Sequence, residues 1–210
     1  MEFKFTPEEE NFRTELRAFL TQELPDGWTG GMDEEEANWD FTLEMRKKLA
    51  AKGWLTMAWP EEYGGQGASH MMQLIFSEEM AYQRAPGRDQ FGTKMLAPTL
   101  MIHGTEEQKK LYLPKLVSGE WTGTMCLTEP HCGTDLGLLR TKAEPQADGS
   151  YKLNGAKIFI SAGEHDMAEN IVHLVLARLP DAPKGSKGIS LFLVSKYKVK
   201  ADGSLGERNG

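Results

Sequence analysis

The sequence has 210 residues, of which 40% are hydrophobic and 26% charged, and its formal net charge is −7 at pH 7. This composition is typical of a folded protein and excludes a disordered tail, and the length permits one large domain or two small ones. The acidic balance argues against nucleic acid as a partner, because phosphate backbones attract basic surfaces.

The sequence also argues against a membrane span, a targeting peptide and a metal site. No window approaches the ~20 apolar residues that a membrane helix needs. The acidic run Glu8–Glu10 does not fit a signal or transit peptide. Only Cys126 and Cys132 are present, and without a second pair they predict reduced thiols and no zinc site. We therefore expect a cytoplasmic protein.

The first part of the sequence predicts helices. Thr6, Pro7 and Glu9 form a capping box with proline at the first helical position, and Pro25 ends the helix that follows. A second capping box, Thr105 to Gln108, predicts a helix that runs to Leu116. The other predicted helices cover residues 40–52, 71–82 and 90–103. We expect residues 1–120 to be a helical domain.

After Gly119 the hydrophobic pattern changes to that of short strands. Residues 171–178 carry apolar side chains on both faces, which predicts a strand covered on both sides. The other predicted strands are 122–128, 138–144, 151–153, 157–161 and 188–194, and residues 201–210 have the composition of turns. We expect residues 121–210 to be a β domain, which makes the fold class α+β.

The stretch 125–135 is the first candidate site. A strand runs into Thr128-Glu129-Pro130, and a glycine with a hydroxyl follows at Gly133 and Thr134. Such a loop exposes backbone amides and hydroxyls that suit a planar heterocycle or a phosphate. The spacings of a P-loop and of a dinucleotide-binding GxGxxG motif are both absent. A capped strand end without a ligand is an equally open interpretation.

Residues 157–161 are the second candidate. Strand alternation places Phe159 and Ser161 on one face, where a ring and a hydroxyl suit a flat cofactor. The alternative is that Phe159 is a core residue, which is the more frequent role of a strand phenylalanine.

Four motifs in this order carry a family resemblance: residues 53–67 (GWLTMAWPEEYGGQG), 103–116 (HGTEEQKKLYLPKL), 127–135 (LTEPHCGTD) and 157–161 (KIFIS). Together they resemble the FAD-dependent acyl-CoA dehydrogenases. The tracts 136–142 and 163–187 are similar to a branch that includes methylmercaptopropionyl-CoA dehydrogenases.

The resemblance implies a helical N-terminal domain, an antiparallel β-barrel-like middle domain and a C-terminal four-helix domain. We expect this chain to hold the first two, with the middle domain incomplete at its end, and to lack the third. In the family a glutamate of the third domain is the catalytic base, so no catalytic residue is assigned here.

The resemblance also implies FAD as cofactor. It places Thr128 at the isoalloxazine edge, and it matches Phe159-Ile160-Ser161 to the Trp-Ile-Thr motif that packs on the flavin. Thr134 stands where the family usually has serine, near the acyl-CoA pantetheine or the flavin phosphates, so it is also the predicted substrate-binding residue. The full predicted cofactor set is Met125, Leu127, Thr128, Gly133, Thr134, Phe159, Ile160 and Ser161.

The implied activity is α,β-dehydrogenation of an acyl-CoA thioester in fatty-acid β-oxidation, with hydride transfer to FAD. Electron-transferring flavoprotein or a similar acceptor is the implied partner, and the full-length enzyme is expected to be a homo-oligomer. The alternative is a truncated, non-catalytic protein or subunit that binds flavin or acyl-CoA. A hydrolase that uses the thiol of Cys126 or Cys132 is a third possibility, for which the sequence indicates no histidine partner.

Overall fold

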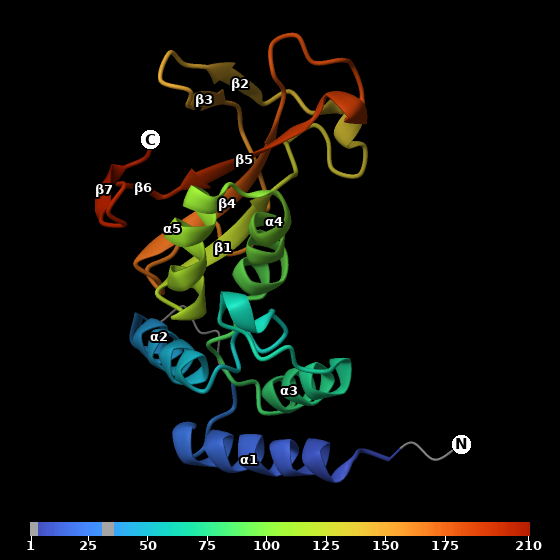
Figure 1. Cartoon of the computed structure of the whole chain (residues 1–210), viewed down its shortest axis with the longest axis vertical. Coiled ribbons are helices and arrows are strands. Elements are labelled where there is room, and N and C mark those ends of the chain that lie inside the picture. The colour runs from blue at the N-terminus through green and yellow to red at the C-terminus, as the bar shows by residue number, and fades with distance from the viewer. Residues whose placement is uncertain (1–3, 31–35) are drawn as a thin grey trace. The chain divides into compact units, whose positions relative to one another are not determined.

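The computed structural model describes residues 4–30 and 36–210, and contacts divide the chain into two units (Figure 1). The first unit contains residues up to 89 together with 112–120 and 166–168, and the second contains 90–111, 121–165 and 169–210. Among the described helices, none is long and apolar enough to cross a membrane. The domain boundary at residue 120 stays a prediction.

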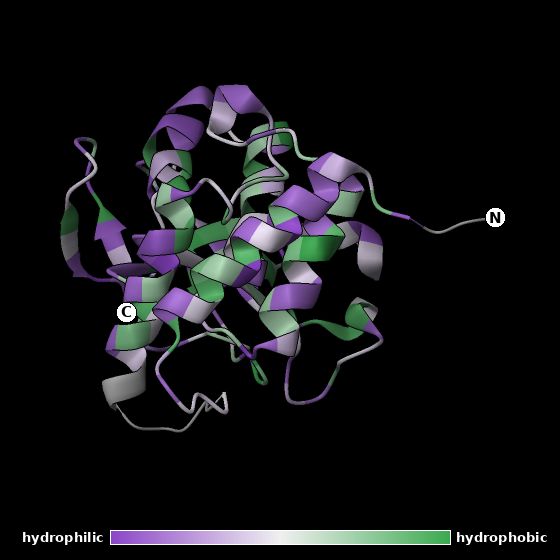
Figure 2. Ribbon diagram, turned by 90° about the horizontal axis from the view of Figure 1, so that it is seen from below, coloured by the Kyte–Doolittle hydropathy of each residue, from purple (hydrophilic) through white to green (hydrophobic). Residues whose placement is uncertain are grey.

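In the described residues up to 89, the first unit has three α-helices. Helix α1 (Pro7–Glu23) begins at the predicted capping box, where the Glu9 amide donates to the Thr6 hydroxyl and the Thr6 amide to the Glu9 carboxylate. Helix α2 spans Glu36–Ala51, the short η1 spans Glu61–Tyr63, and α3 spans His70–Tyr82 with Ser69 as its cap. The helices carry hydrophobic and hydrophilic stripes (Figure 2), as amphipathic helices do.

The core of this unit lies where these helices meet. Trp54 receives the edges of two α1 rings, Phe12 at 5.7 Å and Phe19 at 5.2 Å between ring centroids. The fully buried side chains around it come from all three helices: Leu16, Leu20, Met45, Leu49 and Met80. Apolar burial of this extent is the main stabilising term of such a unit.

The predicted helix at 90–103 contains a π-helical segment. The segment η2 (Gly92–Leu96) is π-helical and continues into α4 (Ala97–His103). A π turn adds a residue to the turn and shifts the inward face. Leu96 and Leu100 are therefore buried, whereas Met95 is 40% exposed. Helix α5 (Glu106–Val117) begins at the second predicted capping box, which is confirmed by the hydrogen bonds between Thr105 and Gln108.

The main sheet of the second unit has the order β1-β4-β5, with β1 at Trp121–Cys126, β4 at Asn170–Ala177 and β5 at Ser190–Ser195. The β4–β5 pair is antiparallel, but β1 runs parallel to β4, so the expectation of an antiparallel sheet is wrong for this pair. Strand β4 is largely buried, which confirms the prediction of two covered faces.

Two hairpins complete this unit. They are β2 (Lys142–Pro145) with β3 (Tyr151–Asn154), and β6 (Tyr197–Val199) with β7 (Leu205–Arg208). Strand β7 lies within the stretch 201–210, which was expected to be turns. Short helices η3 (Leu136–Leu138) and η4 (Ser186–Gly188) lie in its loops. The described strands do not close into a barrel, and residues 157–161 form no strand. The structure therefore confirms the predicted order of a helical part followed by a sheet-containing part. The described strands do not confirm the predicted barrel.

A close backbone approach packs η2 on the sheet. A Cβ atom on Gly123 of β1 would lie 2.6 Å from the Cα of Gly92. Glycine is needed here because any side chain would separate the helix from the strand. This contact fixes β1, and with it the loop that follows β1.

Candidate functional site

The loop after β1 is a tight reversal. The Glu129 amide donates to the Cys132 carbonyl at 2.9 Å, and the Cys132 amide to the Glu129 carbonyl at 3.1 Å. Pro130 and His131 form the two-residue turn between them. A Cβ on Gly133 would meet only the Cγ2 of Thr128, at 3.8 Å, so the chain returns beside Thr128.

The Glu129 carboxylate anchors this loop from inside the unit. The side chain is 2% exposed, and it accepts hydrogen bonds from the Arg140 amide at 2.8 Å and the Thr141 amide at 3.0 Å. The Thr141 hydroxyl and the Lys157 ammonium donate to the same carboxylate, the latter at 2.9 Å. Four donors from two segments, 140–141 and 157, thus converge on one buried charge.

These donors decide the protonation of Glu129. Burial raises the pKa of the carboxyl, but the hydrogen bonds from Thr141, Arg140 and Lys157 outweigh it and lower the pKa to about 2. A carboxylate with so low a pKa is a poor proton acceptor, so Glu129 is not a general base.

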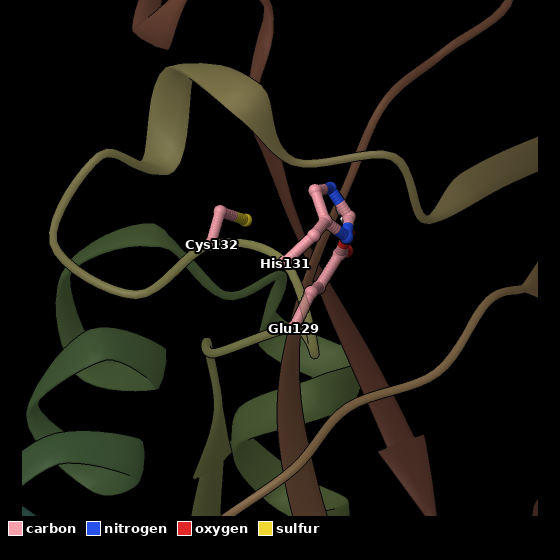
Figure 3. Close-up of side chains that lie close together, drawn as sticks. All are labelled: Glu129, His131 and Cys132. Carbon is pink, nitrogen blue, oxygen red and sulfur yellow. Dashed lines mark ion pairs between the residues drawn. The ribbon is translucent and has the colours of Figure 1, made fainter.

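Glu129, His131 and Cys132 form a compact group on the turn (Figure 3). One ligand-type atom from each lies within 4.8 Å of the others, and the His131 Nε2 is 3.6 Å from the Glu129 carboxylate. The Lys157 ammonium already neutralises that carboxylate, and the His131 ring lies 3.0 Å from the Leu138 carbonyl. The arrangement is therefore explained as a loop anchor, and we assign no metal to it.

The structure brings the two candidate segments together. The Ile158 amide donates to the Thr128 carbonyl at 3.0 Å, and the Lys157 ammonium to the Leu127 carbonyl at 3.1 Å. The Thr124 hydroxyl donates to the Ser161 carbonyl at 2.6 Å. The segment 157–161 thus follows β1 and its loop without joining the sheet.

Phe159 is the most exposed large apolar side chain among the described residues. Its ring is 90% exposed, and its φ of 57° is left-handed, as is the φ of 55° at Ala162. The strand alternation that we expected is wrong because the backbone turns here. The interpretation of Phe159 as a core residue is wrong as well.

Three hydroxyl groups of this surface are unused. In the part of the chain that the structure describes, no hydrogen bond engages the side-chain hydroxyls of Thr128, Thr134 or Ser161. Thr134 and Ser161 are exposed and Thr128 is half-buried, as are the predicted neighbours Met125, Leu127 and Ile160. An exposed ring beside hydroxyls without partners fits a planar polar group such as the flavin of FAD.

An open hollow of about 480 Å³ lies at the end of the same loop. Arg178 builds its wall by donating to the carbonyls of Leu139, Gly137, Pro183 and Gly185. Asp135, next to Thr134, and Lys184 also line it.

The two thiols are buried, and one of them, Cys126, has a histidine neighbour. The structure places the His173 Nδ1 3.8 Å from the Cys126 Sγ, a neighbour that the sequence did not indicate. Burial raises the pKa of Cys126, and burial lowers the pKa of His173, so both groups are neutral at pH 7. A thiolate nucleophile is not favoured in this setting.

Sequence reasoning missed Glu129 and Lys157 as organising residues. Both residues stood in the sequence only as members of motifs. For Lys157 the available signal was its position between Ala156 and Ile158, because a buried charge requires a partner. Which partner it finds depends on the fold.

A helical part followed by a sheet-containing part defines an α+β protein. Two family descriptions match this chain: "Acyl-CoA dehydrogenase, N-terminal domain" over residues 6–120, and "Acyl-CoA dehydrogenase, middle domain" over residues 124–207. The chain belongs to the acyl-CoA dehydrogenase family, whose members are flavoprotein oxidoreductases.

Individual relatives agree. The 3-methylmercaptopropionyl-CoA dehydrogenase of Ruegeria pomeroyi is 44% identical over 75% of this chain and 27% of its own length. The short-chain acyl-CoA dehydrogenase of Clostridium acetobutylicum is 36% identical over 100% of this chain and 54% of its own. The ChsE4–ChsE5 complex of Mycobacterium tuberculosis matches 92% of this chain and 48% of its own, with a TM-score of 0.77 and 36% identity. The chain therefore spans about half or less of these relatives.

Proposed function

We propose that this protein takes part in FAD-dependent α,β-dehydrogenation of an acyl-CoA thioester. The observation that carries the proposal is that segments 124–128 and 157–161 are bonded to each other and carry the exposed Phe159 side chain and the Thr128 and Ser161 hydroxyls, which make no hydrogen bond in the described residues. Family membership supports the same reaction class.

In this proposal Met125, Leu127, Thr128 and Gly133 hold the cofactor from one side, and Phe159, Ile160 and Ser161 from the other. Bound FAD would supply the acceptor for the β-hydride. The Thr128 hydroxyl donates to the flavin edge, and the Phe159 ring covers a flavin face. These roles are supported by the exposure and the unused hydroxyls of the residues.

The Thr134 hydroxyl is proposed to contact the acyl-CoA. The neighbouring hollow has room for part of a nucleotide, and Lys184 at its wall offers a cation for phosphate. We assign the catalytic base to none of these residues. Glu129, the carboxylate of the loop, is fully engaged and has a pKa of about 2.

The partners and location are proposed on the family resemblance. The proposed partners are electron-transferring flavoprotein or a similar acceptor and a second copy in a homo-oligomer. The proposed location is the cytoplasm. The alternative is a non-catalytic protein that binds flavin or acyl-CoA.

The first experiment adds FAD to the purified chain, removes free FAD by desalting and records the visible spectrum. A retained flavin band supports the cofactor site, and its absence contradicts the site. Addition of acyl-CoA and an artificial electron acceptor then separates the two functions, because turnover supports the dehydrogenase and retention without turnover supports the binding protein.

Thr128→Val tests the predicted flavin contact. Loss of one hydrogen bond at nearly constant volume should weaken FAD binding roughly five- to tenfold, because such a bond is worth about 1 kcal/mol. Titration with FAD measures the effect. Thr99→Val on α4, whose hydroxyl bonds the Met95 carbonyl, is the matched control and should bind like the unaltered chain.

A further inference from the structure

We propose that Lys157 is a positioning residue of the FAD site, because its pair with Glu129 holds residues 157–162 in the conformation that presents Phe159. This inference rests on the proposed function, since it concerns how the FAD surface is held. Lys157 itself contacts the loop and is not proposed to touch FAD.

The ammonium of Lys157 joins two segments that are distant in sequence. It donates to the Leu127 carbonyl at 3.1 Å and to the Glu129 carboxylate at 2.9 Å, and the side chain is only 10% exposed. A surface ion pair contributes little, but removal of one partner from a buried pair leaves an uncompensated charge. The Lys157–Glu129 pair is a buried pair, so its disruption should leave an uncompensated charge.

The other end of the pair is fixed to the unit. Glu129 also accepts from the Arg140 and Thr141 amides, which lead into β2. Lys157 is thus bonded to a carboxylate that is itself fixed by the Arg140 and Thr141 amides. This bond restrains the segment that follows Lys157.

The segment that follows needs such a restraint. Phe159 and Ala162 both have left-handed φ values, a conformation that is strained for a residue other than glycine. The exposed Phe159 ring gains little from packing, so contacts on both sides must maintain the turn. Those contacts are Lys157 and the Ile158 amide on one side and the Thr124–Ser161 bond on the other.

Lys157→Met tests the inference because it keeps the length of the side chain and removes its charge. In the chain without FAD, the Ile158 amide should exchange its hydrogen about tenfold faster, because its bond to Thr128 opens more often. The FAD dissociation constant should rise about tenfold or more. At saturating FAD, the visible circular dichroism of the bound flavin should change, since the ring is held differently.

Lys198→Met is the matched control, because Lys198 also pairs with a glutamate, Glu207 at 2.7 Å, but both side chains are exposed. It should leave all three measurements unchanged. Lys157→Arg keeps the charge and should recover most of the FAD affinity. If Lys157→Met does not fold, the double variant Glu129→Gln/Lys157→Met, which leaves no buried charge, takes its place.

The outcomes separate the two proposals. Unchanged exchange at Ile158 overturns the inference, and so does faster exchange with unchanged FAD affinity and dichroism, which would make Lys157 purely structural. If the unaltered chain binds no FAD, the proposed cofactor site fails first and the positioning role fails with it. Binding by the unaltered chain that Lys157→Met does not weaken overturns only the positioning role.

Discussion

Glu129 and Phe159, which lie in the two segments of the candidate site, differ in burial, charge and backbone conformation. At one end Glu129 is buried, charged and bonded by four donors. At the other end Phe159 is exposed, apolar and held in a left-handed backbone conformation. The first arrangement stabilises the fold, whereas the second gains nothing within the described unit. This contrast fits our proposal that the buried end holds the fold and the exposed end contacts FAD.

The largest effect is expected when the buried Glu129–Lys157 ion pair is broken. Glu129→Ala removes the acceptor and leaves the Lys157 ammonium without its carboxylate, so the free energy of unfolding should fall by about 3–5 kcal/mol. Denaturant unfolding followed by circular dichroism measures this. Glu207→Ala breaks an exposed pair as the control and should change stability by less than about 1 kcal/mol. Equal effects of the two substitutions would contradict the contrast.

A smaller loss of stability is expected when acid protonates Glu129. The pKa of Glu129 falls from 4.5 to about 2 on folding, so its contribution is complete above pH 4.5 and is lost as the pH falls through 2. The full contribution is about 3 kcal/mol, because one pKa unit corresponds to about 1.4 kcal/mol. Unfolding curves between pH 6 and 2 measure it, and the difference from Glu129→Gln isolates this group. Parallel curves for the two proteins would refute the assignment.

The smallest effect on stability is expected at the exposed end. Phe159→Gly relieves the left-handed strain but adds freedom to the unfolded chain, so stability should change by less than about 1 kcal/mol. FAD retention should nevertheless be lost with the ring. Phe192→Gly is the control, since Phe192 packs edge-on against Tyr151 at 5.1 Å, and it should lower stability by more than about 2 kcal/mol. A large destabilisation by Phe159→Gly would show that the ring packs within the protein.

Local signals in the sequence predicted the local structure well. Both capping boxes are present because they depend only on residues three positions apart. The burial of β4 followed from its continuous apolar pattern. The π segment Gly92–Leu96 within the predicted helix 90–103 was not predicted, and it changes the helical period.

Long-range relations were not predictable in the same way. The parallel β1–β4 pair joins strands whose patterns fit either direction. Residues 157–161 carry the alternation of a strand, yet the backbone turns at Phe159. Strand β7 has few apolar residues, and the stretch 201–210 that contains it was predicted to be turns.

The sequence by itself determined the starts of the two helices with capping boxes and the change from helices to strands. It determined them because capping, periodicity and motif order are properties of neighbours along the chain. The tertiary structure alone decided that Lys157 meets Glu129 and that Phe159 faces solvent. Those outcomes depend on the pairing of distant segments, where a buried charge takes whichever partner the fold brings to it.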